Sequence, residues 1–240
     1  MRPPDGRSGD VLAGDVLVSC HGLSRTFGTG PGSVVAVHGV TCEVRAGERI
    51  AVTGPSGSGK STLLHLLAGL DRPTAGSVTW PGLGGADRLR PGPVGVVFQG
   101  QSLIESLDVA ENVALPLLLA GAGEAEAADM AGRAHGLLGL AELAERLPEE
   151  LSGGQAQRVA VARVLAGRPR LILADEPTGQ LDHVTGAGVI DALVQTAAGL
   201  GAALVLTTHD DAVADRLALH WRMADGTLTG AGDRGLSCSA

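Results

Sequence analysis

One loop constrains the fold of this chain more than any other feature of its sequence. The segment Gly54-Pro55-Ser56-Gly57-Ser58-Gly59-Lys60-Ser61-Thr62 follows a short apolar run and precedes a helical pattern. It matches G-x-x-x-x-G-K-S/T, whose glycines let backbone N–H groups turn towards phosphate oxygens at the positive end of a helix. At the residue frequencies of this chain, roughly 0.003 matches arise by chance. We therefore predict a phosphate-binding loop between a strand and a helix.

The loop also contains the side chains that phosphate chemistry requires. Lys60 is the only lysine among 18 basic residues, and its compact ammonium group can reach the outer phosphates of a nucleotide. The hydroxyl of Ser61 can serve as a ligand to Mg²⁺. The residues expected to bind phosphates are Gly54, Ser56, Gly57, Ser58, Gly59, Lys60, Ser61 and Thr62.

Two carboxylates follow a second apolar run. Residues 171–174 are continuously apolar, which is typical of a strand buried on both faces, and Asp175 and Glu176 come directly after them. Asp175 is placed to hold Mg²⁺, and Glu176 to polarise a water molecule for attack on a phosphoryl group. A solvated acidic turn is the alternative, but it leaves the phosphate loop unexplained.

Two further polar side chains follow apolar runs in the same way. His209 comes shortly after the run at 203–207, and Gln99 directly follows the run at 94–98. Because open α/β sheets bind ligands at the carboxyl ends of their strands, both are expected to lie beside the phosphate loop. His209 is a candidate contact to the terminal phosphate, and Gln99 a candidate ligand to Mg²⁺ or to the attacking water.

A second possible phosphate site lies further along the chain. Leu151-Ser152-Gly153-Gly154-Gln155 precedes a helical pattern that continues to about residue 166. Ser152 and Gln155 form an S-x-x-Q capping box, which is a complete structural explanation. The two glycines weaken a first helical turn unless a ligand approaches its backbone closely. One nucleotide needs only one phosphate-binding loop. We therefore expect this second phosphate-binding segment to complete a site on another subunit.

The order of the elements predicts an α/β domain. Strands are expected at 16–18, 34–44, 49–53, 76–80, 94–98, 171–174 and 203–207, and helices at 60–68, 152–166 and 186–198, with a helical insert within 103–150. Strands that alternate with helices indicate a parallel sheet with both faces covered. We predict a leader at 1–15, one domain at 16–232 and a tail at 233–240.

Composition excludes several other classes. A net charge of -8 argues against a protein that binds nucleic acid. Three cysteines without a C-x-x-C pattern make a disulfide framework or a zinc site unexpected. The richest apolar stretch, at 113–122, is interrupted by Pro116 and is shorter than the roughly 20 residues of a membrane span. The first 15 residues lack the apolar segment of a signal peptide. We expect a cytoplasmic protein.

The motifs together resemble those of the ATP-binding subunits of ABC transporters. The correspondence covers about residues 16–230, and six motifs occur in the family's order. They are the Walker A loop (54–62), the Q-loop residue Gln99, the LSGGQ signature (151–155), the Walker B strand with its glutamate (171–176), the D-loop (179–182) and the H-loop residue His209. The resemblance implies an ABC cassette with a RecA-like parallel-sheet core, an N-terminal antiparallel β subdomain and a helical subdomain inserted at about 100–160.

The resemblance also implies partners and roles. Phe27 would stack on the adenine ring of ATP, and Asp182 would belong to the nucleotide site. Two copies would form a head-to-tail homodimer, in which Ser152, Gly153, Gly154 and Gln155 of one copy face the ATP held by the other. The helical insert would dock on an integral membrane permease, which would hold the protein at the inner face of the cell membrane.

Within the family, the stretch from 97 to 117 is most similar to the LolD, MacB and FtsE branch. Gln180 departs from the usual D-loop, Glu105 and Asp108 depart from the region after Gln99, and the segment 81–93 is short and rich in glycine and proline. None of these departures removes a group expected to act on ATP.

Three functions are weighed at this point. The leading one is an ATPase that drives a separate permease. A DNA-repair or chromosome-maintenance ATPase would carry a long coiled-coil insert, for which the residues between Thr62 and Ser152 leave no room. A regulatory ATPase of the FtsE type, whose output is dimerisation itself, is the third.

Overall fold

The computed structural model describes residues 14–100, 102–179 and 181–231. The expected tail, Gln180 and all of the expected leader except residues 14 and 15 lie outside the described residues. Within them, the strands are β1 (Val16–Phe27), β2 (Val34–Arg45), β3 (Arg49–Thr53), β4 (Ala75–Thr79), β5 (Val94–Val97), β6 (Leu171–Asp175), β7 (Ala203–Thr207), β8 (Leu219–Ala224) and β9 (Thr227–Thr229).

These strands form two sheets. The first is antiparallel, with the order β2-β1-β4. The second has the order β5-β6-β7-β3-β8-β9, and its strands run parallel except for β9, which pairs antiparallel with β8. Strands β5, β6, β7 and β3 therefore end at the same edge, which is the edge where the expected site residues follow them.

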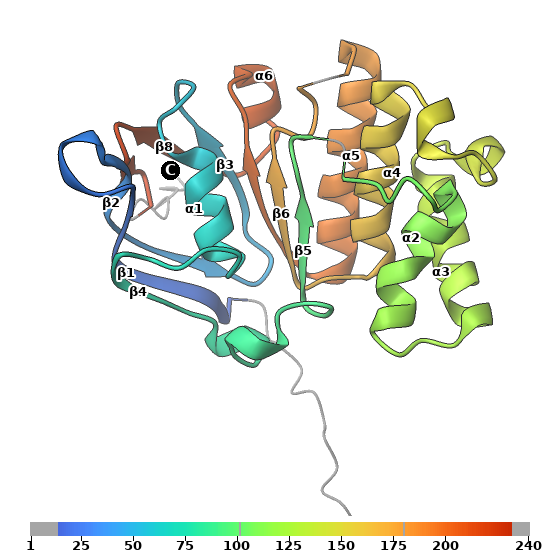
Figure 1. Ribbon diagram of the computed structural model, residues 1–240, viewed down its shortest axis with the longest axis horizontal. Helices are drawn as coiled ribbons and strands as arrows, with labels where there is room; N and C mark the ends of the chain where they lie inside the picture. Colours follow the sequence, from blue (N-terminus) through green and yellow to red (C-terminus); the bar gives the residue numbers. More distant parts are fainter. Residues whose placement is uncertain (1–13, 101, 180, 232–240) are drawn as a thin grey trace, which may run out of the picture.

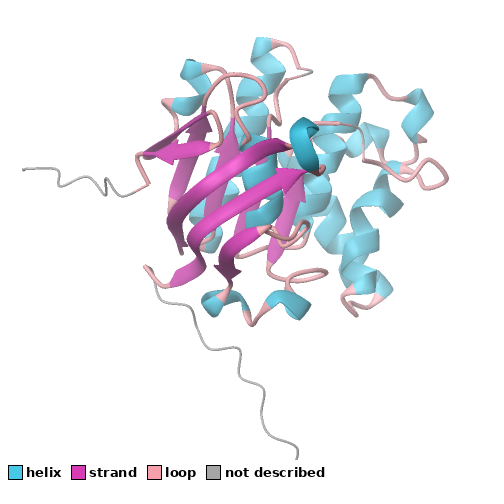
Figure 2. Cartoon of the chain, turned by 60° about the vertical axis from the view of Figure 1, so that its left-hand side comes forward, coloured by secondary structure: helices cyan, strands magenta, loops and turns pink. Residues whose placement is uncertain are grey.

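Helices cover both faces of the second sheet. They are α1 (Lys60–Leu67), α2 (Val109–Leu119), α3 (Glu124–Leu137), α4 (Gly153–Ala166), α5 (His183–Leu200) and the short α6 (Asp211–Ala214). Helix α1 lies between the two sheets, whereas α4 and α5 lie on the other face of the parallel sheet, with α2 and α3 beyond them (Figure 1). In Figure 2 most strands gather at one side of the view and most helices at the other. Among the described residues, no helix combines the length and apolar character of a membrane span.

The parallel sheet has a hydrophobic core on each face, and successive side chains of its central strands point alternately into one core and the other. Leu171 and Leu173 of β6 pack with α1 and the antiparallel sheet, whereas Ile172 and Ala174 pack with the helices on the opposite face. All four side chains are fully buried. A strand with two buried faces has no polar face, which explains why its sequence is a continuous apolar run. The prediction of a doubly covered parallel sheet is confirmed.

Several predicted boundaries differ from the structure. The first strand continues to Phe27 instead of ending at residue 18, and it does so through bulges that accommodate its polar residues. Helix α5 begins at His183, three residues before its expected start, because the side chain of Asp182 caps its first N–H groups. Strands β8 and β9 were not expected, and β8 alternates exposed and buried residues.

Candidate active site

Space and backbone conformation both require the glycines of the phosphate loop. Gly54 has φ +146°, and a Cβ there would lie 2.0 Å from the carbonyl oxygen of Met223. Gly59 has φ +101°, and a Cβ there would lie 2.0 Å from the carbonyl oxygen of Ala36. No side chain caps the start of α1 after Gly59. The loop therefore presents its helix N-terminus without a competing side chain, as an anion-binding loop requires.

Lys60 is held inside this loop. Its Nζ donates hydrogen bonds to the carbonyl oxygens of Gly54 and Pro55, both at 3.0 Å, and lies 3.8 Å from Oε1 of Glu176. The residue is 6% exposed. A buried ammonium group is costly unless it is paired, and here two neutral carbonyls and one distant carboxylate provide the pairing. Because two of its three partners are neutral carbonyls, the Lys60 ammonium group keeps a charge that an anionic ligand can pair with.

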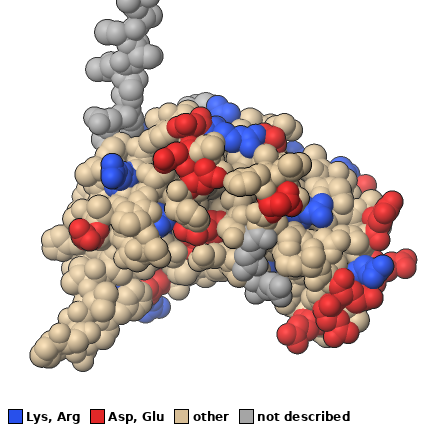
Figure 3. All heavy atoms as spheres, turned by 90° about the horizontal axis from the view of Figure 1, so that it is seen from above, with Lys and Arg blue, Asp and Glu red and all other residues tan. Residues whose placement is uncertain are grey.

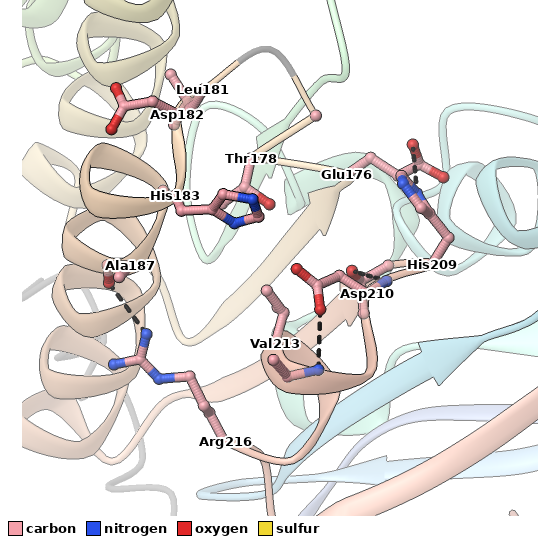
Figure 4. A pocket seen from close by; sticks show the side chains of 14 residues that line it. Glu176, Thr178, Leu181, Asp182, His183, Ala187, His209, Asp210, Val213 and Arg216 are labelled. Atoms are coloured by element: carbon pink, nitrogen blue, oxygen red, sulfur yellow. Dashed lines mark hydrogen bonds and ion pairs between the residues drawn. The ribbon is translucent and has the colours of Figure 1, made fainter.

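Three of the expected side chains surround the carboxylate of Glu176. Besides Lys60 near Oε1, the amide Nε2 of Gln99 donates to Oε2 at 3.2 Å, and Nδ1 of His209 lies 3.5 Å from Oε2. Figure 4 shows His209 pointing towards Glu176 across the end of the sheet. These residues follow β5, β6 and β7 or begin α1, so the predicted convergence of strand ends on the phosphate loop is confirmed.

Asp175 differs from Glu176 in its surroundings. It is 6% exposed, and Oγ1 of Thr207 donates a hydrogen bond to its Oδ1 at 2.6 Å. Its second oxygen, Oδ2, has no hydrogen-bond partner among the described residues. A buried carboxylate with one free oxygen fits the role of a ligand to Mg²⁺. Sequence reasoning missed the contact from Thr207, because that contact depends on the register between β6 and β7.

A cavity of about 500 Å³ opens beside these residues. Its lining comprises Ala36, Ser56, Gly57, Gly59, Lys60, Ser61, Thr62, Gln99, Glu176 and His209. The buried hydroxyl of Ser58 has no hydrogen-bond partner within the described part of the chain. A glycine cradle, a buried lysine and an unpaired buried hydroxyl all fit the phosphates of a nucleotide, and the oxygen donors of Ser61, Asp175 and Gln99 fit Mg²⁺.

The LSGGQ segment forms the predicted capping box. Oγ of Ser152 accepts from the N–H of Gln155 at 3.2 Å, and Oε1 of Gln155 accepts from the N–H of Ser152 at 2.8 Å. These residues and Gly154 line a separate cavity of about 320 Å³, together with Asp182. Gly153 is the first residue of α4 and lies beside them. The 500 Å³ cavity and this one have no lining residue in common. Within one copy of the chain, the phosphate loop and the LSGGQ segment therefore line separate cavities.

Asp182 serves as the N-cap of α5. Its Oδ1 accepts hydrogen bonds from the N–H groups of Val184 at 3.1 Å and Thr185 at 3.0 Å. Hydrogen bonding from Thr185, first through its side chain and then through its backbone, lowers the pKa of Asp182. Asp182 and Glu176 line opposite parts of a third cavity of about 310 Å³ (Figure 4).

Phe27 does not line the nucleotide cavity. It lies at the end of β1 and is 42% exposed, and the guanidinium carbon of Arg25 lies 4.5 Å from the centre of its ring. Nε of Arg25 is in turn paired with Oδ2 of Asp71 at 2.8 Å. The ring is therefore exposed but held in place, which leaves it available for stacking.

The charge distribution on the face above the sheet is mixed. Figure 3 shows this face with its Lys and Arg side chains interspersed among Asp and Glu, and with acidic side chains densest at one end. The described residues on this face form no continuous basic surface of the kind that binds a nucleic-acid backbone.

The fold and the cavity together define the class of protein. It is an α/β domain of the phosphate-loop type, which binds nucleotides, and it carries the LSGGQ segment at the start of a second helix. The sequence matches the family described as ABC transporter over residues 37–179. The chain belongs to the ABC transporter ATP-binding family and is an ATPase of that family. The resemblance and the fold class predicted from the motifs are both confirmed.

Comparison with individual proteins narrows the branch. The lipoprotein-releasing system ATP-binding protein LolD of Paramagnetospirillum magneticum is 42% identical over 220 residues, which cover 87% of this chain and 97% of that protein. LolD of Legionella pneumophila is 39% identical over 221 residues, with 89% and 97% coverage. A solved dimeric structure of the ATP-binding cassette MJ0796, in a post-hydrolysis state with ADP and Pi, has a TM-score of 0.83 at 35% identity and covers 89% of this chain and 97% of that one. The predicted likeness to the LolD branch is confirmed.

Proposed function

We propose that the chain is the ATP-hydrolysing subunit of a transporter of the lipoprotein-release type and powers a separate membrane permease. The observation that carries the proposal is the carboxylate of Glu176, which lies at the wall of the phosphate-loop cavity among Lys60, Gln99 and His209. A carboxylate in this position can orient a water molecule towards the terminal phosphate and accept its proton.

Each neighbouring group has a defined task in this proposal. Lys60 and the loop N–H groups neutralise the charge of the outer phosphates, while His209 contacts the terminal phosphate. Ser61, Asp175 and Gln99 hold Mg²⁺, which when bound neutralises charge on the phosphate oxygens. Phe27 stacks on the adenine ring. In the structure, Glu176 already contacts Gln99, so entry of the nucleotide must redistribute the hydrogen bonds of that carboxylate.

The site is completed by a second copy of the chain. Ser152, Gly153, Gly154 and Gln155 form a helix N-terminus whose cavity is separate from that of the phosphate loop. A head-to-tail pair brings this segment of one copy onto the phosphates held by the other, with Asp182 at the junction. The dimeric ATP-binding cassette that the chain resembles supports this arrangement.

The loop after Gln99 and helix α2 provide the surface for the permease. The loop after Gln99 leaves Ile104 41% exposed, and α2 leaves Leu118 41% and Leu119 69% exposed. Arg163 of α4 donates a hydrogen bond to the carbonyl oxygen of Ser102 at 2.8 Å. A partner that presses on this surface therefore acts on the same segment that positions Gln99. The names of the LolD relatives support a lipoprotein-release system, and docking would keep the chain at the cytoplasmic face of the membrane.

Replacing Glu176 with glutamine tests the proposal. Glu176→Gln should lower kcat by at least about 100-fold, the lower range for loss of a general base, while ATP still binds and the ATP-bound protein elutes as a dimer. Glu126→Gln, on the exposed first turn of α3, is the matched control and should keep wild-type turnover. The permease is expected to be the multi-span protein that co-purifies with Glu176→Gln in ATP and less with wild-type protein in ADP. Wild-type turnover by Glu176→Gln would refute the assigned role.

A further inference from the structure

Thr207 is the last residue of β7 and lies directly opposite Asp175 in the register between β6 and β7. It is fully buried at 0% exposure. A threonine at a buried strand end needs a partner for its hydroxyl, because an unpaired buried hydroxyl destabilises the fold. Here the partners are the two acidic residues that end β6.

The hydroxyl of Thr207 uses both of its hydrogen-bonding capacities on these residues. It donates to Oδ1 of Asp175 at 2.6 Å and accepts from the backbone N–H of Glu176 at 3.0 Å. The same N–H also lies 3.2 Å from the carbonyl oxygen of Thr207. A single side chain therefore links the carboxylate of one acidic residue to the backbone of the next.

These contacts restrain Glu176 in an unusual conformation. Its φ is +43°, in the left-handed region that non-glycine residues rarely adopt. Such a conformation persists only where surrounding contacts determine it, and the hydrogen bonds from its N–H to Thr207 supply that determination. The direction in which the Glu176 carboxylate leaves the sheet edge therefore depends on Thr207.

The contact with Asp175 restrains the other carboxylate. With Oδ1 occupied by the Thr207 hydroxyl, Asp175 is fixed in one orientation and Oδ2 has no partner among the described residues. A short hydrogen bond to a carboxylate is among the stronger ones in proteins. The hydroxyl thus sets which oxygen is presented to a metal ion.

We propose that Thr207 is a positioning residue for ATP hydrolysis: its hydroxyl orients Asp175 towards Mg²⁺ and Glu176 towards the attacking water. The inference rests on the proposed roles of those two acidic residues. Thr207 touches neither nucleotide nor metal in this assignment and acts only through them.

The test compares Thr207→Val, which keeps the branched shape and strand preference but removes the hydroxyl, with Thr207→Ser, which keeps the hydroxyl. Because hydrogen bonds to charged groups contribute substantially, Thr207→Val should lower kcat by about tenfold or more. The Mg²⁺ concentration for half-maximal activity should rise several-fold, while ATP affinity measured in EDTA stays at the wild-type value. Thr207→Ser should recover most of kcat and the Mg²⁺ dependence.

Controls separate this role from a loss of packing. Thr79→Val, in β4 of the antiparallel sheet, removes a strand hydroxyl far from the site and should leave both parameters unchanged. Melting temperatures show whether each variant is folded; if Thr207→Val is not, Thr207→Cys, whose thiol is a weak donor, replaces it with the same expected loss.

Wild-type kcat and Mg²⁺ dependence in a folded Thr207→Val would overturn the inference, as would an equal loss in Thr207→Ser. If Glu176→Gln and Asp175→Asn retain wild-type turnover, the proposed function fails instead. If they lose it while Thr207→Val does not, only the inference fails.

Discussion

Replacing Asn112 with alanine should lower the free energy of unfolding by about 2 kcal/mol. Asn112 is the only asparagine of the chain and is fully buried in α2. Its Oδ1 accepts from the N–H of Ile104 at 2.8 Å, and its Nδ2 donates to the carbonyl oxygens of Ile104 at 3.0 Å, Leu107 at 2.8 Å and Asp108 at 3.0 Å. One side chain therefore holds the loop between Gln99 and α2.

The expected magnitude follows from which groups lose their only partner. The carbonyl oxygens of Ile104 and Asp108 keep backbone donors, from Leu107 and Asn112 respectively. The N–H of Ile104 and the carbonyl oxygen of Leu107 keep none among the described residues. Two groups at about 1–3 kcal/mol each give about 2–6 kcal/mol. Water reaching the partly exposed loop and the higher helix propensity of alanine reduce this to the low end of the range.

Urea unfolding provides the measurement, with Gln195→Ala as the matched control because its amide is exposed on α5. The control should stay within about 0.5 kcal/mol of wild type. Asn112→Ala should melt about 4–8 °C lower, from the usual scaling for domains of this size, and amide hydrogen exchange should accelerate at Ile104. Equal stability of the two variants, with Ile104 still protected, would refute the reasoning.

Two further predictions concern the shared site and the buried thiols. A mixture of Ser152→Ala and Lys60→Ala proteins should not regain the turnover of two working sites, because each mixed dimer contains at most one intact composite site; full wild-type turnover of the mixture would exclude the shared site. Cys20 and Cys42 are buried partners across β1 and β2, and the hydrogen bond that the Cys42 thiol makes with Cys20, together with burial, raises the pKa of Cys42. Cys42 thus stays protonated in the folded state while the unfolded chain ionises near its ordinary pKa of 9.0. Stability should therefore fall as pH rises above that value, less so in Cys42→Val, and thermal unfolding at increasing pH measures the difference.

The parts of the fold that the sequence predicted share a physical cause. Strands buried on both faces consist of apolar residues only, so Leu171–Asp175 and Ala203–Thr207 could be located almost to the residue. The phosphate loop could be located because positive φ angles and close backbone contacts leave no choice but glycine at Gly54 and Gly59.

The parts that it missed depend on pairing between distant segments. From residue 21 to its end, β1 contains His21, Gly22 and Arg25. The residues of this part therefore do not alternate between apolar and polar, and the sequence pattern does not indicate a strand there. Strand β8 leaves His220 exposed between the partly buried Leu219 and the buried Trp221, yet its Met223 provides the carbonyl that confines Gly54. Thr207 belongs to the same group, since nothing local to residue 207 indicates that Asp175 lies opposite it.

The proposed division of the ATP site between two cavities follows from the architecture itself. Lys60 begins α1 a few residues after the end of β3, and Glu176 directly follows β6, whereas Ser152 caps the start of α4, a helix packed on one face of the same parallel sheet. The N-terminus of a helix packed in this way faces the same side of the molecule as the strand ends but is displaced laterally from them (Figure 1). Because α4 buries most of its side chains in the core, it cannot turn towards Lys60 without unpacking. A second copy related by a two-fold axis can supply the missing segment with both folds unchanged, which makes dimerisation the least disruptive way to join the two halves.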